Sequence, residues 1–211
     1  MNREEKNALS RQRILEAALE EFSHRGYEAA SLSNVCAEKG ISKGIIYHHF
    51  KDKEELYLLC VERCFAQISA YLREAAGKLS GTAEEKLAAY FDARLRFFAL
   101  QPVYLGIFAE AAFNPPAALT EEIARRRQGF DRLNAAVLSD LLEAAPLRKG
   151  LKAAAVVEDF RMYMDCFHLR FRSAFRSGRS MDEILAEHEE KCRRQLDILL
   201  HGVWEDSNEK E

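Results

Sequence analysis

The chain has 211 residues, of which 48% are hydrophobic and 31% are charged, and its formal net charge is −3. This composition is ordinary for a folded globular protein and argues against disorder. The chain has no long uncharged apolar run and its start is too charged for a secretory signal peptide, so we expect no membrane span and a cytoplasmic location.

The spacing of apolar residues predicts an all-α protein, because they recur three and four residues apart and no useful alternating β pattern is present. We expect a first helix over about 10–25, with Ser10 as its N-cap and Gly26 as its end. Two short helices should follow Ser31 and Ser42, and Asp52 should cap a long helix that starts at Lys53 and ends near Lys78. Further helices are expected over about 82–100, 102–113, 117–144, 152–177 and 181–203, which makes about nine in all.

The second short helix has an unusual distribution of side chains around its axis. At about 100° per residue, Ile46 and Phe50 share one side and should anchor this helix to the first one. The opposite side and its edges hold a glycine, an isoleucine, a tyrosine and a histidine, where glutamate and lysine would be usual. Glycine allows close approach to the backbone, and isoleucine can contact a thymine methyl group. We use the name outward face for the exposed surface of this helix, which consists of Gly44 and His48 opposite Ile46, Ile45 and Tyr47 beside them, and Lys43 in the first turn.

Positive charge gathers around the same short helix. Residues 39–53 contain four lysines against one aspartate, although the whole chain is acidic. Ser31 and Ser33 open the first short helix, where hydroxyl and backbone N–H groups suit phosphate. Lys53 is the first residue of the long helix, where a positive charge interacts unfavourably with the helix dipole. A phosphate partner therefore explains a lysine at this position better than helix stability does. Together these features predict a helix-turn-helix that binds double-stranded DNA.

Residues 30–56 resemble the N-terminal motif of the TetR/AcrR family. The most specific part is the core Gly-Ile-Ser-Lys-Gly-x-x-Tyr-x-x-Phe-x-x-Lys at 40–53. Ala30, Cys36 and Lys39 stand where threonine and two alanines are usual, and these departures leave the motif intact. Beyond the motif, the chain resembles the family only in its length and its helical layout.

The resemblance implies a three-helix DNA-binding domain followed by a helical domain that binds an effector and dimerises. We expect the first domain at 1–56, the second at 57–204 and a frayed tail at 205–211. The resemblance implies base reading by Lys43, Gly44 and Ile45 and mostly phosphate contact by the other family positions. The residues predicted to meet DNA, including the two serines, are Ser31, Ser33, Lys43, Gly44, Ile45, Tyr47, His48, His49 and Lys53.

The resemblance also implies a homodimer formed by the last two long helices. The last helix favours this, because its apolar residues repeat at alternating spacings near three and four, although a helix packed on its own core is the alternative. A two-fold dimer predicts a near-palindromic operator with half-sites about one DNA turn, or a multiple of it, apart. The predicted interface residues are Phe171, Phe175, Met181, Leu185, His188, Cys192 and Leu199.

The middle helices are rich in aromatic residues, most of which should lie in the core. A subset is expected to line a pocket for a small apolar or aromatic effector, with an acyl-type anion as a variant. Arg94, Arg161 and His168 are the polar candidates, although surface roles are more common for such residues. The predicted pocket residues are Phe91, Arg94, Phe98, Tyr104, Phe108, Tyr163, Phe167 and His168.

No arrangement of residues predicts an enzyme, a cofactor or a metal site. Five cysteines in a chain without an export signal indicate reduced thiols, and the pair Cys60 and Cys64 is better explained as small buried hydrophobes. The stretch from His188 to Cys192 lacks the second histidine of a zinc protease. The leading hypothesis is a repressor that a small molecule releases from its operator. The alternative is a helical ligand- or redox-sensing protein whose helix-turn-helix is only structural.

Overall fold

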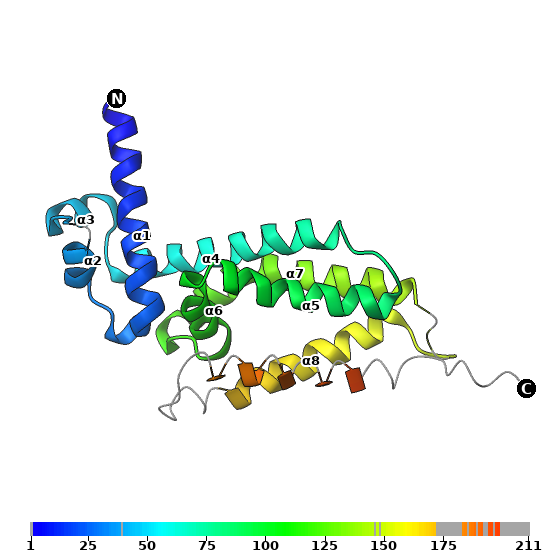
Figure 1. Cartoon of the computed structure of the whole chain (residues 1–211). Coiled ribbons are helices and arrows are strands. Elements are labelled where there is room, and N and C mark those ends of the chain that lie inside the picture. Colours follow the sequence, from blue (N-terminus) through cyan, green and yellow to red (C-terminus); the bar gives the residue numbers. More distant parts are fainter. Residues whose placement is uncertain are drawn as a thin grey trace, which may run out of the picture. The chain divides into compact units, whose positions relative to one another are not determined.

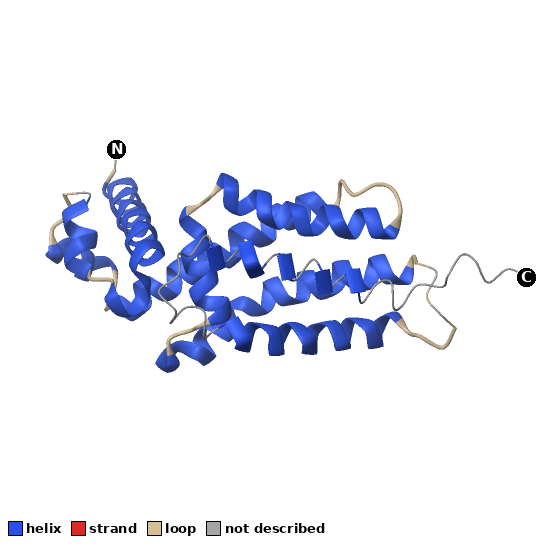
Figure 2. Cartoon of the chain, turned by 60° about the horizontal axis from the view of Figure 1, so that its bottom comes forward, coloured by secondary structure: helices blue, strands red, loops and turns tan. Residues whose placement is uncertain are grey.

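The computed structural model describes residues 2–38, 40–145, 147, 149–171 and part of 183–198. Over these residues the chain is helical and has no strand (Figures 1 and 2), which confirms the all-α prediction. None of the described helices is long and apolar enough to cross a membrane. The elements are α1 (Arg3–Ala29), α2 (Leu32–Glu38), α3 (Lys43–His49), α4 (Lys53–Ala76), α5 (Ala83–Leu100), α6 (Val103–Phe113), the short 3-10 helix η1 (Ala117–Leu119), α7 (Thr120–Glu143) and α8 (Ala153–Phe171).

The first helix begins earlier than predicted. Its N-cap is Asn2 and not Ser10, because the Asn2 side chain accepts a hydrogen bond from the Glu5 N–H at 2.7 Å. The Glu5 carboxylate accepts one in return from the Asn2 N–H at 2.9 Å. This reciprocal capping box satisfies two donors at the helix start. The helix therefore runs through Ser10 without a break.

Two predicted helix boundaries are confirmed. Gly26 interrupts α1 with φ 69° and ψ 172°, so the straight part of the helix ends there, and a last turn follows as far as Ala29. A positive φ of this kind is easy only for glycine. Asp52 caps α4, since its side chain accepts a hydrogen bond from the Glu55 N–H at 2.8 Å.

The chain packs as two compact units. The first joins residues 1–67 with 98–128, and the second joins 68–97 with 129–211. The core of the second unit is formed by Leu87 of α5, Leu138 and Leu142 of α7 and Val156 of α8. The predicted boundary at residue 56 concerns function and stays a prediction. The first unit has its own core, which includes Ile14, Ala18, Phe22, Val35, Ile46, Phe50, Leu56 and Ile107.

Much of the predicted dimer interface lies outside the described residues. This applies to five predicted positions and to the side chain of Phe171. The described positions between 183 and 198 are all helical, in line with the predicted last helix. Among them, His188 is buried within the single chain, which fits the alternative that this position packs on its own core. The five positions are Phe175, Met181, Leu185, Cys192 and Leu199.

Candidate nucleic-acid interface

α3 has one side in the core of the first unit and the opposite side in solvent. Ile46 is 0% exposed, whereas Ile45 and Tyr47 are 42% and 57% exposed. The backbone at Gly44 is open, because a Cβ placed there would meet no atom within 4 Å. His48 is exposed as well, so Gly44 and His48 lie on the side opposite Ile46, as the helix geometry predicted, with Ile45 and Tyr47 beside them. Lys43, in the first turn of α3, is also exposed.

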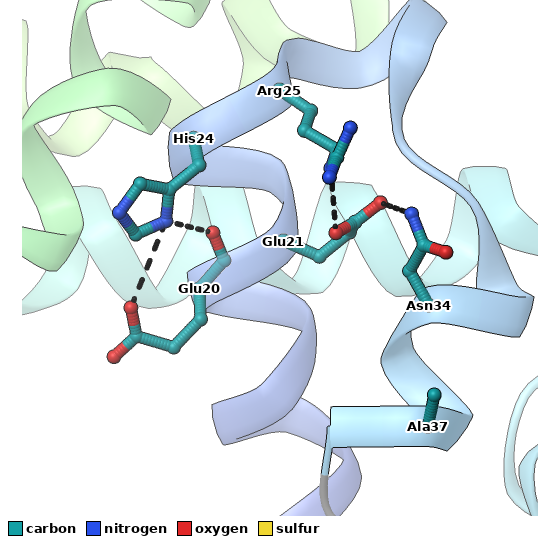
Figure 3. A pocket seen from close by; sticks show the side chains of 6 residues that line it. All are labelled: Glu20, Glu21, His24, Arg25, Asn34 and Ala37. Carbon is teal, nitrogen blue, oxygen red and sulfur yellow. Dashed lines mark hydrogen bonds and ion pairs between the residues drawn. The ribbon is translucent and has the colours of Figure 1, made fainter.

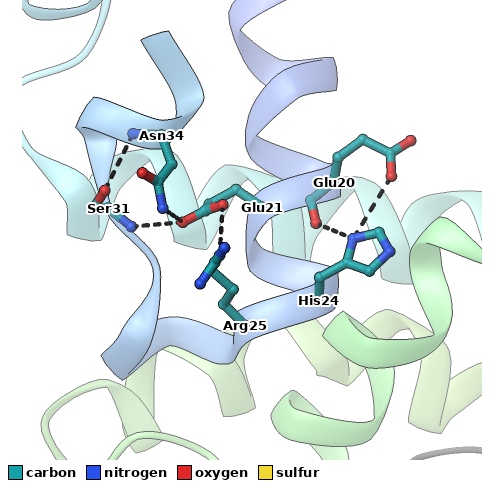
Figure 4. Close-up of polar contacts among 6 residues, drawn as sticks. All are labelled: Glu20, Glu21, His24, Arg25, Ser31 and Asn34. Carbon is teal, nitrogen blue, oxygen red and sulfur yellow. Dashed lines mark hydrogen bonds and ion pairs between the residues drawn. The ribbon is translucent and has the colours of Figure 1, made fainter. Parts of the chain in front are cut away.

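α1 supports both short helices, which lie together beside it (Figure 1). A buried carboxylate of α1, Glu21, accepts hydrogen bonds from the Ser31 N–H at 3.0 Å and from Asn34 Nδ2 at 2.8 Å (Figure 4). Arg25 Nε lies 3.2 Å from the same carboxylate. These contacts hold the start of α2 against α1. An open pocket beside them is lined by Glu20, Glu21, His24, Arg25, Asn34 and Ala37 (Figure 3).

The two serines before and within α2 differ in their surroundings. The Ser31 hydroxyl accepts a hydrogen bond from the Asn34 N–H at 3.1 Å, so it is used as the cap of α2. Ser33 is exposed. A phosphate could therefore reach the Ser33 hydroxyl without competing with a cap, whereas contact with Ser31 would have to share the capping oxygen.

Lys53 has partners within the chain that the sequence did not reveal. Its Nζ donates a hydrogen bond to the Glu28 carbonyl at 3.2 Å and lies 4.6 Å from the centroid of the Tyr27 ring. A cation is favourable at the end of α1, because carbonyl groups there lack helical partners. The structure thus supplies an internal reason for this lysine, and its contact with DNA stays a prediction.

Two histidines end α3, and their ring centroids are 5.1 Å apart. Burial lowers the pKa of His49, and the positive charges of His48 and Arg11 lower it further. Arg11 itself lies over the Phe50 ring, 5.2 Å from its centroid. A neighbouring phosphate would counteract all three causes, because an opposite charge favours the protonated imidazole.

α6 is joined to α1 and α4 through one carboxylate that the sequence analysis missed. Glu110 accepts hydrogen bonds from the Tyr27 N–H, at 3.0 Å to each oxygen, and from the Tyr57 hydroxyl at 2.8 Å. Burial raises the pKa of Glu110, although both hydrogen bonds oppose the rise. Gly26 leaves room for this carboxylate, since a Cβ there would lie 2.8 Å from Glu110 Oε1.

A second close contact lies one turn before Glu110 on α6. A Cβ at Gly106 would lie 2.1 Å from the carbonyl oxygen of Ser23 in α1. α1 and α6 therefore meet at backbone distance at this point. No local pattern in the sequence identifies such a pair, because its two members are far apart along the chain.

The predicted pocket residues divide between the two units. In the first unit, the rings of Phe98 and Phe108 pack with centroids 4.9 Å apart. In the second unit, the Arg94 guanidinium lies 5.2 Å from the centroid of the Phe91 ring. The described contacts of these rings are core contacts, and the pocket stays a prediction. Tyr104 is buried, Tyr163 is half-buried, and the side chains of Phe167 and His168 lie outside the described residues.

The cysteine pair of α4 has the surroundings expected of small hydrophobes. Cys60 and Cys64 are both free and buried, and burial raises the pKa of each thiol. A raised pKa keeps these thiols protonated and poorly reactive. Among the described residues, no group of three or more His, Cys, Asp or Glu side chains is placed to hold a metal ion.

Residues 14–60 match the model of a family described as bacterial regulatory proteins, tetR family. These residues run from the buried part of α1 through α2 and α3 into α4, and so include the outward face. Residues 14–60 of the chain belong to the TetR family. The TetR match thus covers α3 and the helices that pack against it. It confirms the resemblance seen in the motif at 40–53.

Curated relatives are similar to this chain over its first part. The helix-turn-helix transcriptional repressor AcnR of Corynebacterium efficiens is 40% identical over 76 residues, which are 36% of this chain and 35% of AcnR. The transcriptional activator FasR of Mycolicibacterium smegmatis is 38% identical over 65 residues, 31% of this chain and 30% of FasR. The chain thus spans about a third of the length of these relatives.

The similarity of fold extends over most of the chain. The crystal structure of the transcriptional regulator FadR from Bacillus subtilis in complex with stearoyl-CoA superposes with a TM-score of 0.61 at 18% identity. The superposition covers 85% of this chain and 95% of FadR. The helical region that follows the TetR motif therefore has the fold of a known regulator.

Proposed function

We propose that this chain binds double-stranded DNA through the outward face of α3 and regulates transcription. The supporting observation is that Ile45 and Tyr47 are exposed on a helix whose Ile46 is fully buried. A short helix held in this way has the size and support of a helix that enters the major groove. Lys43 and His48 supply hydrogen-bond donors, and Ile45 supplies an apolar surface for a thymine methyl group.

The control of this binding is a further part of the proposal. We propose a cytoplasmic homodimer on a near-palindromic operator, released by a small apolar or aromatic effector or an acyl-type anion. The effector would shift the population toward a dimer whose two α3 helices no longer match the groove spacing. FadR, whose fold is similar, was solved with stearoyl-CoA, which favours the acyl variant. We propose repression as the outcome, and a reporter assay with and without acyl compounds tests both points.

We expect Lys43→Ala and Tyr47→Ala to weaken DNA binding by about 10-fold or more while the fold stays intact, because both side chains are exposed. Fluorescence anisotropy on a selected operator and on a mixed-sequence duplex measures this. Tyr47→Ala should weaken both duplexes equally if it contacts phosphate, whereas Lys43→Ala should change base preference if it reads a base.

The matched controls are Lys152→Ala and Leu100→Ala, which remove an exposed lysine and an exposed apolar side chain elsewhere. Both controls should bind DNA as the unchanged protein does. If Lys43→Ala and Tyr47→Ala also bind normally, the alternative of a ligand-sensing protein with a purely structural helix-turn-helix is favoured.

Gly44→Ala should separate stability from DNA binding. Alanine is the better helix former, and its methyl group at this position meets no atom within 4 Å, so we expect about 0.5–1 kcal/mol of added stability. DNA binding should nevertheless fall about 5-fold or more, because the methyl group occupies space next to the base edges. Gly129→Ala in α7, equally open, is the control that should add stability and leave DNA binding unchanged. A Gly44→Ala protein that binds as tightly as before contradicts close backbone approach.

A further inference from the structure

The first turns of α1 form a helical segment that adds nothing to the hydrophobic core. The first buried residue of α1 is Ile14, and every residue from Asn2 to Leu9 is exposed. The segment is nevertheless held as a helix by the capping box of Asn2 and Glu5. Figure 1 shows this end of α1 reaching beyond α2 and α3. An ordered extension without a core role raises the question of what it contacts.

Three of the cations that precede Ile14 lie on one side of the helix, whereas Arg11 points elsewhere and contacts Phe50. At about 100° per residue, Arg13 lies within about 20° of Lys6 around the axis, and Arg3 lies within about 60°. The same geometry places Glu4 and Glu5 at least about 100° away from Lys6. We call the side that carries Arg3, Lys6 and Arg13 the basic stripe.

The basic stripe borders a groove that α3 shares. The groove has a volume of about 230 Å³, and Ile45 of the outward face forms part of its wall. Leu9 contributes an apolar side chain that is 49% exposed. The groove therefore continues the outward face of α3 toward α1. Its lining residues are Lys6, Leu9, Ser10, Arg13, Gly40, Ile41 and Ile45.

We infer that the basic stripe of α1 is a second DNA-binding surface, which binds the phosphodiester backbone of the duplex that α3 contacts. This inference rests on the proposed function. Two observations favour a DNA strand as the partner of this groove. The positive charges of Lys6 and Arg13 complement phosphate, and Ile45 belongs both to the groove and to the outward face. Each strand of a duplex carries a phosphate charge about every 3.4 Å along the axis, so a strand that passes Ile45 presents successive phosphates to the stripe. Leu9 and Ile45 then border the sugars between them.

Lys6→Ala, Arg13→Ala and the double variant in the full chain test this surface. The probe is a mixed-sequence duplex of about 30 base pairs, titrated at several salt concentrations, because phosphate contacts appear in the salt dependence of binding. We expect each single change to weaken binding about 3- to 10-fold and to reduce the slope of log affinity against log salt by about 0.9. Lys6→Arg should keep the slope of the unchanged protein.

One control variant and three possible results make the outcomes distinct. Lys152→Ala removes an exposed lysine elsewhere and should leave affinity and slope unchanged. If Lys6→Ala and Arg13→Ala both bind with the same salt dependence as the unchanged protein, the basic stripe does not bind phosphate. The proposed function would still hold in that case. If the alanine variants change the oligomeric state of the protein but not the salt dependence of DNA binding, the groove contacts a second copy of the chain. That result also contradicts the inference. If the unchanged protein binds no duplex at low salt, the proposed function fails together with the inference.

Discussion

Gly106→Ala is expected to destabilise the protein by about 3 kcal/mol, even though alanine is the better helix former. A Cβ at this position would lie 2.1 Å from the carbonyl oxygen of Ser23 and 2.9 Å from its carbonyl carbon. These are backbone atoms of α1, so they cannot rotate away as a side chain does. α6 would have to move away from α1, and Glu110, one turn further along α6, would lose its alignment with Tyr27.

Urea denaturation of the full chain measures this effect. Gly129→Ala is the matched control, because Gly129 also lies inside a helix and a Cβ there would meet nothing within 4 Å. The control should gain about 0.5–1 kcal/mol of stability. A comparable gain for Gly106→Ala would show that α1 and α6 do not pack at backbone distance.

Glu110→Ala is expected to lower the free energy of unfolding by about 2–4 kcal/mol, because two donors lose their acceptor. These donors are the Tyr27 N–H and the hydroxyl of the fully buried Tyr57. Glu110→Gln should cost about 1 kcal/mol or less, since its amide oxygen still accepts one of the hydrogen bonds. Equal losses for both variants would mean that the hydrogen bonds of the carboxylate are not what stabilises the contact.

The same carboxylate predicts a pH dependence of stability. Burial raises the pKa of Glu110 in the folded chain above its ordinary value of 4.5. The folded state then binds the proton more tightly than the unfolded state, so the contribution is fully present below pH 4.5 and is lost as the pH rises through the folded pKa. The free energy of unfolding of the unchanged protein, relative to Glu110→Gln, should therefore fall as the pH is raised across this range.

Glu122→Gln provides a comparison of opposite sign. The hydrogen bond from Arg126 lowers the pKa of Glu122, so the stabilising contribution of this carboxylate is lost as the pH falls through its folded pKa. Denaturation midpoints of the three proteins over one pH series separate the two directions. A Glu110→Gln difference that grows with pH, as that of Glu122→Gln should, would contradict the raised pKa of Glu110.

The orientation of α3 follows from local geometry, and the sequence was sufficient to predict it. Helical periodicity alone assigns Ile46 and Phe50 to the core and Gly44 and His48 to the solvent, and the structure agrees. The helix end at Gly26 and the cap at Asp52 are equally local, because each depends on neighbours within a few residues. The N-cap of α1 shows the limit of this reasoning, since Ser10 was the predicted cap and the capping box at Asn2 forms instead.

The sequence by itself determined that the chain is all-helical with a TetR-type motif and which residues of its short helix face outward, because these features depend on spacing over a few turns. Only the tertiary structure decided that Glu110 accepts from Tyr27, 83 residues away, and that Gly106 meets the backbone of Ser23. It also decided that Lys53 binds the end of α1 and that Lys6 lines the same groove as Ile45. The physical reason is that each of these contacts joins separate segments, so it depends on how whole helices pack and leaves no trace in the pattern of either segment alone.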